Sequence, residues 1–410
     1  MKKTLLICGH YPLPENIGGN IRTMNFVRFF KNYGTVDIAY SHILPEAKVG
    51  NDIFSNEYLL KNKDYQRFKK RLINGFIKGI PVPIYEFCEA SQRLLRTAIE
   101  ANDYDYIIVR YVYSTSILFK LAAKYKERII LDFDDILSGP LYESMHSSVN
   151  GCFKKFIMDM NKRLLVNYEK KCLNFSASLF CSRKDMSKVV GKNNMDNTFI
   201  MPNIYTNKSF EDYNFGDGFI NGNNLLFVGT LCYKPNIDGL KWFIKTVFPG
   251  LKKEFPDAKL LVVGRFTDPE VKKLCEKNAG IELYADVPDI RGYYKQCKAV
   301  IVPLLAGGGT RIKILEAALA NRPVLSTPIG AEGLNLVNQK DLLLFENASG
   351  FYAQYNKLFN KDWYNFIVQN AKEVVLTQYS TQRFNDAMEK VLSWLEHKNA
   401  KRSHSILFVS

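Results

Sequence analysis

The sequence predicts an α/β protein in which two doubly wound, Rossmann-like domains face a central cleft. Three observations predict this fold. Short apolar segments, typical of buried strands, alternate with longer amphipathic segments, typical of helices. The alternation pauses in a polar stretch rich in glycine and asparagine, residues 207–224, and then restarts. The length of 410 residues also suits two or three domains better than one.

The first half of the chain contains the elements of one sheet. A strand at 5–9 leads through a loop that contains Gly18-Gly19 into a helix at 21–33, where the apolar residues follow a helical period. The other elements are expected as strands at 36–40, 105–110, 128–133, 177–181 and 199–201 and a helix at 114–125. Because this order suits a parallel sheet covered by helices, residues 1–205 are expected to form an N-terminal domain.

The second half repeats the pattern. Strands are expected at 224–229, 258–264, 281–284, 299–303 and 323–326, and helices at 238–253, 269–278, 290–297, 312–320 and within 350–397. Residues 206–375 are therefore expected to form a second Rossmann-like domain. A helix at 376–397 can pack back on the first domain, and the tail at 398–410 has no clear pattern.

Charge and cysteine usage narrow the partners and the compartment. The formal net charge of +15 favours an acidic partner, although it also suits a lysine-rich surface that only keeps the chain soluble. No nucleic-acid-binding motif appears, so nucleic acid is not expected. The eight cysteines lack metal-ligand spacing, which indicates a reducing cytoplasm without disulfides or structural zinc. No apolar run reaches the ~18 residues of a membrane-spanning helix, and the apolar N-terminus is too short for a signal peptide.

Two segments rich in lysine and arginine interrupt the strand–helix rhythm. Residues 58–80 and 151–175 interleave these cations with phenylalanine, leucine and isoleucine. Such a helix either lies on an anionic membrane surface or is an ordinary helix with its apolar face in the core. The sequence leaves both open, so a peripheral position on the inner face of the membrane is an expectation.

The most informative stretch runs from Val302 to Ala318. It predicts a buried strand, a turn of three glycines and a helix that opens with Arg311, Lys313 and Glu316. Glycines let a ligand approach the backbone, and a helix N-terminus offers unpaired N–H groups to an anion. The two cations suit phosphate and the carboxylate suits sugar hydroxyls, which together indicate a nucleotide. The alternative is a glycine turn that only joins a strand to a helix.

Several motifs occur in a fixed order along the second half. They are LFVGT at 226–230, PNIDG at 235–239, LVVGR at 261–265, VPD at 287–289, the segment 307–316, RPV at 322–324 and GAEGL at 330–334. In this order they resemble the retaining GT-B glycosyltransferases of family 4, the glycosyl transferases group 1 type, from bacterial surface-polysaccharide pathways. The likeness is specific over 224–346 and weaker in the first half.

The resemblance implies a nucleotide-sugar donor in the C-terminal domain and an acceptor in the N-terminal domain. It implies that Glu316 binds the donor ribose and that the glycine turn approaches the sugar and diphosphate through its backbone. The residues expected to bind the donor are Gly18, Gly19, Lys234, Gly264, Arg265, Val287, Gly308, Gly309, Thr310 and Glu316.

The chain departs from the family pattern at three positions. Gly308 replaces the first of two acidic residues, Thr230 stands in place of an arginine, and Asp134 stands in place of a histidine. Transfer needs positive charge on the departing diphosphate, so Lys313 and Arg311 are expected to supply it, with Arg265 as a further candidate.

Asp134 lies in the acidic run Asp132-Phe133-Asp134-Asp135 that ends a predicted strand. Asp134 or Asp135 can orient the acceptor hydroxyl or accept its proton, and Asp134 is the third candidate catalytic residue. Two other interpretations are a divalent-metal site and a helix cap. The resemblance argues against a metal.

The expected function is therefore transfer of a sugar, with retention of configuration, from a UDP- or GDP-linked donor to a glycan or lipid-linked glycan in surface polysaccharide synthesis. No metal and no other cofactor is expected. Two alternatives stay open, a GT-B sugar-nucleotide epimerase and a catalytically silent partner that binds nucleotide sugar.

Overall fold

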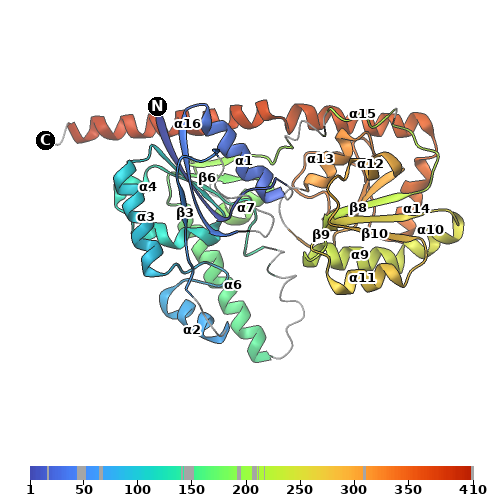
Figure 1. The fold of residues 1–410 in the computed structure, drawn as a ribbon, viewed down its shortest axis with the longest axis horizontal. Helices are drawn as coiled ribbons and strands as arrows, with labels where there is room; N and C mark the ends of the chain where they lie inside the picture. The colour runs from blue at the N-terminus through green and yellow to red at the C-terminus, as the bar shows by residue number, and fades with distance from the viewer. Residues whose placement is uncertain are drawn as a thin grey trace. The chain divides into compact units, whose positions relative to one another are not determined.

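The computed structural model describes residues 1–410 except 16–17, 44–51, 64–67, 140–141, 143–151, 192–194, 206–209, 211, 217, 308–310 and 408–410. Two compact units divide the chain. Unit 1 comprises Met1–Tyr142, His146–Pro202 and Phe384–Ser410, and unit 2 comprises mainly Asn203–Arg383. Each unit contains its own parallel sheet with flanking helices (Figure 1), so the predicted fold class of two doubly wound sheets is confirmed.

The sheet of unit 1 has the order β3-β2-β1-β4-β5-β6-β7, and all its strand pairs are parallel. The strands are β1 (Lys2–His10), β2 (Gly34–His42), β3 (Glu57–Leu59), β4 (Tyr106–Arg110), β5 (Ile129–Asp132), β6 (Ala177–Phe180) and β7 (Thr198–Ile200). The helices are α1 (Gly18–Lys31), α2 (Phe68–Lys78), α3 (Glu89–Asn102), α4 (Ala123–Lys126), α6 (Cys152–Cys172) and α7 (Arg183–Val190), with the 3-10 helix η1 (Val112–Lys120).

The expected single helix at 114–125 is wrong. The segment forms η1 and the short helix α4 instead, because Leu121 and Ala122 between them adopt extended backbone angles. The strand β3 was also missed, because its three residues are only half-buried or exposed and show no apolar run.

The sheet of unit 2 has the order β10-β9-β8-β11-β12-β13, again with parallel pairs. Its strands are β8 (Leu225–Thr230), β9 (Leu260–Arg265), β10 (Ile281–Ala285), β11 (Ala299–Val302), β12 (Val324–Ser326) and β13 (Leu343–Leu344). Its helices are α9 (Lys234–Thr246), α10 (Phe248–Glu254), α11 (Pro269–Glu276), α12 (Arg291–Gln296), α13 (Ile312–Leu319), α14 (Ala348–Lys357) and α15 (Lys361–Gln378).

The C-terminal helix α16 (Thr381–Leu407) completes unit 1. Phe384 packs edge-on against Phe26 and Phe29 of α1, with ring centroids 5.1 and 6.4 Å apart. Within the part of α16 whose side chains are described, the buried residues follow a helical period. They are Phe384, Met388, Val391, Leu392 and Leu395. The helix continues to Leu407, so the expectation of a patternless tail from residue 398 is wrong for most of that segment.

In both sheets, the order in which the chain adds strands reverses at one point. The chain adds β2 and β3 on one side of β1 and then β4 on the other, and it places β9, β10 and β11 around β8 in the same way. Open α/β sheets bind ligands outside the carboxyl ends of the strands at such a switch point. The ends of β1 and β4 in unit 1, and of β8 and β11 in unit 2, are therefore the places to search for a site.

Every helix within the described part of the chain is too short or too polar to cross a lipid bilayer.

Candidate active site

The switch point of unit 2 contains a half-buried lysine. Lys313 lies in the first turn of α13, which follows β11, and its Nζ donates a 3.0 Å hydrogen bond to Oδ1 of Asn236 on α9. The ammonium also lies 4.8 Å from the centre of the Phe227 ring on β8. Burial and the positive charge of Arg311 together lower the pKa of Lys313 to about 7, although the negative charge of Glu316 opposes the shift.

Gly229 at the end of β8 makes room for this ammonium. A Cβ on Gly229 would lie 2.8 Å from Nζ of Lys313 and 2.7 Å from Nδ2 of Asn236. Among the described residues, no carboxylate lies within ion-pair distance of Lys313. The structure therefore places a half-buried cation, which forms no ion pair within the described residues, at the end of two central strands, where it would attract an anionic ligand in spite of the nearby carboxylate of Glu316.

Glu316 lies one turn further along α13 and is buried. The hydroxyl of Tyr294 on α12 donates a 2.7 Å hydrogen bond to its Oε2. Burial raises the pKa of Glu316, although this hydrogen bond and the charge of Lys313 oppose the shift. The predicted phosphate and ribose residues are thus neighbours on one helix face.

Hydrogen bonds connect the carboxyl ends of β9 and β10 with the loop that follows β10. The amide of Asp286 donates to the Gly264 carbonyl at 2.8 Å, and the amide of Phe266 donates to Oδ1 of Asp286 at 3.1 Å. Arg265 ends β9 and Val287 lies in this loop, and both are half-buried. Gly264, Arg265 and Val287 therefore lie at the same carboxyl edge of the sheet as Lys313, as predicted from their positions after strands.

The remaining residues predicted for the donor site in unit 2 differ in their placement. Arg311 is the buried residue directly before α13, and a Cβ on Gly307, whose φ is +125°, would lie 2.8 Å from its Nη2. Lys234 is half-exposed at the start of α9 and pairs with Asp238 one turn later. Gly308, Gly309 and Thr310 lie outside the described residues.

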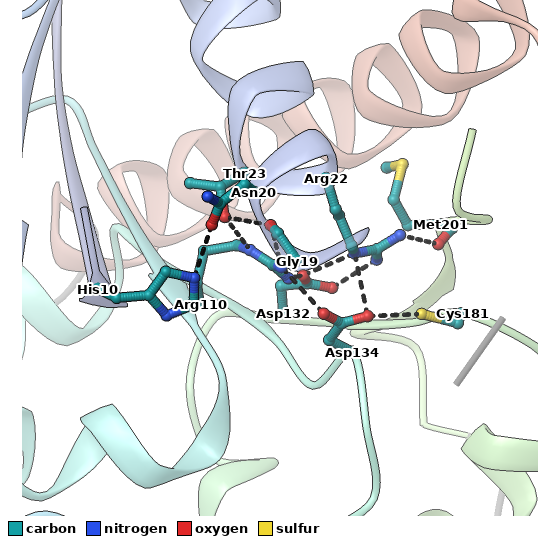
Figure 2. Close-up of polar contacts among 10 residues, drawn as sticks. All are labelled: His10, Gly19, Asn20, Arg22, Thr23, Arg110, Asp132, Asp134, Cys181 and Met201. Atoms are coloured by element: carbon teal, nitrogen blue, oxygen red, sulfur yellow. Dashed lines mark hydrogen bonds and ion pairs between the residues drawn. The ribbon is translucent and has the colours of Figure 1, made fainter. Parts of the chain in front are cut away.

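Unit 1 holds Asp134 in a buried group of two arginines and two aspartates, drawn in Figure 2. Arg22 of α1 donates two hydrogen bonds to Asp132 at the end of β5, at 2.8 and 2.6 Å. Arg110 at the end of β4 bonds Asp134 Oδ2 at 2.9 Å and also contacts Asp132. The thiol of Cys181 donates to Asp134 Oδ1 at 3.4 Å. We call these residues, Arg22, Arg110, Asp132 and Asp134, the buried ion cluster.

The ion pairs of Asp134 with Arg22 and Arg110 bear on whether Asp134 is a proton acceptor, a metal ligand or a helix cap. The charges of Arg110 and Arg22 lower its pKa to about 2 although burial opposes this, so the carboxylate has little tendency to accept a proton at neutral pH. Strand β5 ends at Asp132, and the described residues from Phe133 to Gly139 form turns and no helix. Asp134 therefore caps no helix in this segment. The described residues also contain no group of three or more potential metal ligands.

Gly18 and Gly19 form the first residues of α1, so the expected flexible loop at Gly18-Gly19 is instead the first turn of a helix. The carbonyl of Gly19 accepts hydrogen bonds from Thr23 Oγ1 at 2.7 Å and from Arg110 at 3.3 Å (Figure 2). A Cβ at Gly19 would collide with the hydroxyl of Tyr111, which has a φ of +70°. Gly19 therefore allows close packing between the start of α1 and the end of β4.

Sequence reasoning missed Arg22, Arg110 and Tyr294 of these two sites. It named Asp132 and Asn236 only as parts of longer motifs and gave them no role. A signal existed for Arg110 and Asp132, because each is a charged residue that ends an apolar strand. Arg22 and Tyr294 lie inside helices with ordinary surroundings, and only the tertiary contacts reveal them.

Comparison with known proteins agrees with this architecture. Residues 222–361 match the family described as glycosyl transferases group 1. An uncharacterized 44.6 kDa protein in the cps region of Klebsiella pneumoniae is 26% identical over 97% of this chain and 100% of its own length. A phosphatidyl-myo-inositol mannosyltransferase of Mycolicibacterium smegmatis is 23% identical over 71% of this chain and 72% of its own.

Solved structures share the fold at lower identity. Sucrose-phosphate synthase from Thermosynechococcus elongatus has a TM-score of 0.68 at 14% identity, with 97% of this chain and 100% of that chain covered. HepE of Anabaena, in complex with UDP-glucose, has a TM-score of 0.66 at 13% identity, with 95% of this chain and 99% of that chain covered. WaaG, a glycosyltransferase involved in lipopolysaccharide biosynthesis, has a TM-score of 0.63 at 15% identity, with 93% of this chain and 98% of that chain covered.

The family match covers the segment that carries Lys313 and Glu316, and the solved structures share the arrangement of two parallel sheets. Residues 222–361 thus form a glycosyl transferases group 1 domain, and this chain is a glycosyltransferase with the GT-B fold.

Proposed function

We propose that this enzyme transfers a sugar from a nucleotide-sugar donor to a glycan or lipid-linked glycan acceptor in surface polysaccharide synthesis, with retention of configuration. The observation that carries the proposal is the half-buried ammonium of Lys313 at the switch point of unit 2, which forms no ion pair in the described part of the chain. A diphosphate placed there would form one. It would also lie beside the buried carboxylate of Glu316, which suits a ribose.

In this proposal Lys313 and Arg311 stabilise the negative charge that develops on the departing nucleoside diphosphate. Glu316 accepts hydrogen bonds from the donor ribose, and the carboxyl ends of β9 and β10, with Arg265 and Val287, flank the base. Gly308, Gly309 and Thr310 of the glycine turn, Gly264, and Lys234 of α9 belong to the same donor site. The reaction uses neither a metal nor a further cofactor.

The donor and acceptor classes rest on the relatives. The structure of HepE contains UDP-glucose, which favours a UDP-linked donor over a GDP-linked one. The cps-region relative and the lipopolysaccharide enzyme WaaG favour a surface glycan or its lipid-linked precursor as acceptor. Asp134, in unit 1, holds the end of β5 and β4 in shape for the acceptor rather than accepting its proton.

A thermal-shift titration with UDP, GDP, ADP, CMP and dTDP tests the donor site first. A ligand at ~100 times its dissociation constant should stabilise the fold by about 2.7 kcal/mol. A selective shift that Lys313→Ala removes supports the proposal. A shift with none of the five nucleotides contradicts it.

Retention is tested separately with the matching nucleotide sugar. The anomeric configuration of the product is read by NMR and compared with that of the donor. An inverted product contradicts retention. Release of an isomerised free sugar without any acceptor would replace transfer by an epimerase reaction.

A further inference from the structure

Two tyrosine hydroxyls converge on the buried carboxylate of Glu316 in unit 2. Tyr294 of α12 is fully buried, and its hydroxyl donates the 2.7 Å hydrogen bond to Oε2 of Glu316. Tyr205, which is 5% exposed and lies just after the start of unit 2, hydrogen-bonds the same carboxylate. A carboxylate offers only lone pairs, so both hydroxyls must donate. The carboxylate is thus held by two donors from separate segments of the chain.

The two tyrosines are themselves fixed by their surroundings. The ring of Phe210 packs edge-on against the rings of Tyr205 and Tyr294, with centroids 5.3 and 5.4 Å apart. Arg322, which is 1% exposed, donates from Nε to the Tyr294 carbonyl at 2.7 Å and from Nη2 to the Phe215 carbonyl at 3.1 Å. Side chains packed in this way lose little further freedom when a ligand binds, so the two hydroxyls are preorganised.

The hydroxyls also favour the charged form of Glu316. Burial raises the pKa of Glu316, whereas the hydrogen bond from Tyr294, the positive charge of Lys313 and the hydrogen bond from Tyr205 oppose the shift. An ionised carboxylate offers about four lone-pair sites, and the two tyrosines use two of them. The sites that remain match the two neighbouring hydroxyls of a ribose, which can both donate hydrogen bonds.

We infer that Tyr205 and Tyr294 are positioning residues of the donor site, which fix the carboxylate of Glu316 so that the site selects nucleotides with an intact ribose. A site built to bond a hydroxyl rejects an analogue that lacks it, because the buried polar groups of the site are then left without partners. The substrate class is thereby a ribonucleoside diphosphate sugar. The inference deepens the proposed function and rests on it, since it takes the ribose as the ligand of Glu316.

Isothermal titration of the full chain with UDP and with 2′,3′-dideoxy-UDP tests this role. Both ligands carry the same base and diphosphate, so Lys313 contributes equally to each, and the ratio of the two affinities reports the ribose contact. The wild-type protein should bind UDP at least about tenfold more tightly than the dideoxy analogue. Tyr294→Phe and Tyr205→Phe should each reduce this ratio about 3–10-fold and leave the affinity for the analogue within about twofold of the wild type. If the thermal-shift series selects another nucleotide, that nucleotide and its dideoxy analogue are used.

Two further measurements separate positioning from a merely structural role. In the Glu316→Ala background, Tyr294→Phe should cost no further affinity for UDP, because the tyrosine acts only through the carboxylate. In Tyr294→Phe alone, the affinity ratio should rise between about pH 6 and about pH 8. The reason is that loss of a hydrogen bond to the ionised form raises the pKa of Glu316, and the protonated group accepts fewer hydrogen bonds.

Tyr355→Phe is the matched control for the two tyrosine variants. Tyr355 is a fully buried tyrosine of α14 in unit 2, and its hydroxyl hydrogen-bonds Oδ1 of Asn223 at 3.3 Å. Its loss removes the same atom from the same unit without touching Glu316, so the affinity ratio should keep the wild-type value. Thermal unfolding of each variant, compared with the wild type, shows that the variants are folded.

Three outcomes would overturn the inference and leave nucleotide binding itself intact. They are equal weakening of both ligands in Tyr294→Phe, a further loss of UDP affinity when Tyr294→Phe is added to Glu316→Ala, and equal affinity of the wild-type protein for UDP and its dideoxy analogue. A wild-type protein that binds neither UDP nor any other nucleotide of the thermal-shift series would instead contradict the proposed donor site, and the inference would fall with it.

Discussion

At the scale of single residues, the proposed function depends on the charge of Lys313. Its ammonium hydrogen-bonds only to an uncharged amide, Asn236, among the described contacts. We expect Lys313→Ala to weaken the binding of the nucleoside diphosphate about 10–100-fold, because a hydrogen bond to a charged group is worth about 1.5–3 kcal/mol. The binding of the bare nucleoside should change far less. Isothermal titration of both ligands checks this, and equal losses would show that Lys313 does not meet the diphosphate.

The pH dependence follows from the same lysine. Its folded pKa is about 7, below the ordinary value of 10.5, so above pH 7 the unfolded chain binds more protons at this position than the folded one. This term makes the free protein more stable as pH rises from about 7 toward 10, while the affinity for a diphosphate falls because the ammonium must regain its proton. Calorimetry in buffers of different ionisation enthalpy should detect proton uptake on binding at pH 8. Lys313→Met should abolish the uptake.

Asp134 is predicted to stabilise the fold of unit 1 and not to transfer a proton. Its pKa of about 2 keeps it ionised across the physiological range, and this stabilisation is lost only as pH falls from about 4 toward 2. Asp134→Asn leaves Arg110 and Arg22 with less negative charge nearby and should lower the melting temperature. The limbs of the pH–rate profile between pH 5 and 8 should keep their positions. A variant that melts like the wild type but does not turn over would instead identify Asp134 as a catalytic residue.

At the scale of elements, the proposed donor site depends on close approach between β8, α9 and α13. Gly229 is the residue of β8 that permits it, because an added Cβ would lie 2.8 Å from the Lys313 ammonium. We expect Gly229→Ala to fold but to bind the diphosphate about tenfold more weakly, since the flexible lysine end must move by roughly 1 Å. Gly292→Ala is the control, because a Cβ there meets no atom within 4 Å. Equal affinities in the two variants would show that the lysine has room elsewhere.

The sequence predicts elements well where their pattern is local. The central strands β1, β4, β8, β9 and β11 contain apolar runs, unlike the edge strand β3, and the ligand edge follows from the order of strands and helices. The sequence could not predict the break between η1 and α4, because extended angles at Leu121 and Ala122 leave no mark in the apolar period. Nor could it predict the buried ion cluster, because Arg22 and Asp132 are 110 residues apart and their pairing exists only after β5 and α1 meet.

At the scale of the whole molecule, unit 1 is assembled from both ends of the chain. The N-terminal segment supplies its sheet, and the residues from Phe384 onward return to it as α16. Trp394 packs against Phe199 with ring centroids 5.7 Å apart, and Tyr33 hydrogen-bonds Glu389. The sequence suggested that a last helix can pack back on the first domain, but the tertiary contacts alone identify α1 and β7 as its partners.

The stability of unit 1 should therefore depend on a residue near the C-terminus. Phe384 is 1% exposed and contacts two phenylalanines of α1, so Phe384→Ala should lower the free energy of unfolding of unit 1 by about 3–5 kcal/mol. Phe366→Ala, at a 43% exposed position on α15 of unit 2, should cost much less. Hydrogen exchange followed by mass spectrometry separates the two units. Faster exchange in α1 and β7, with unchanged exchange in β8 and β9, is the expected result. Uniform acceleration throughout the chain would mean that both units unfold as one, and unchanged exchange in α1 would mean that α16 adds little to the stability of unit 1.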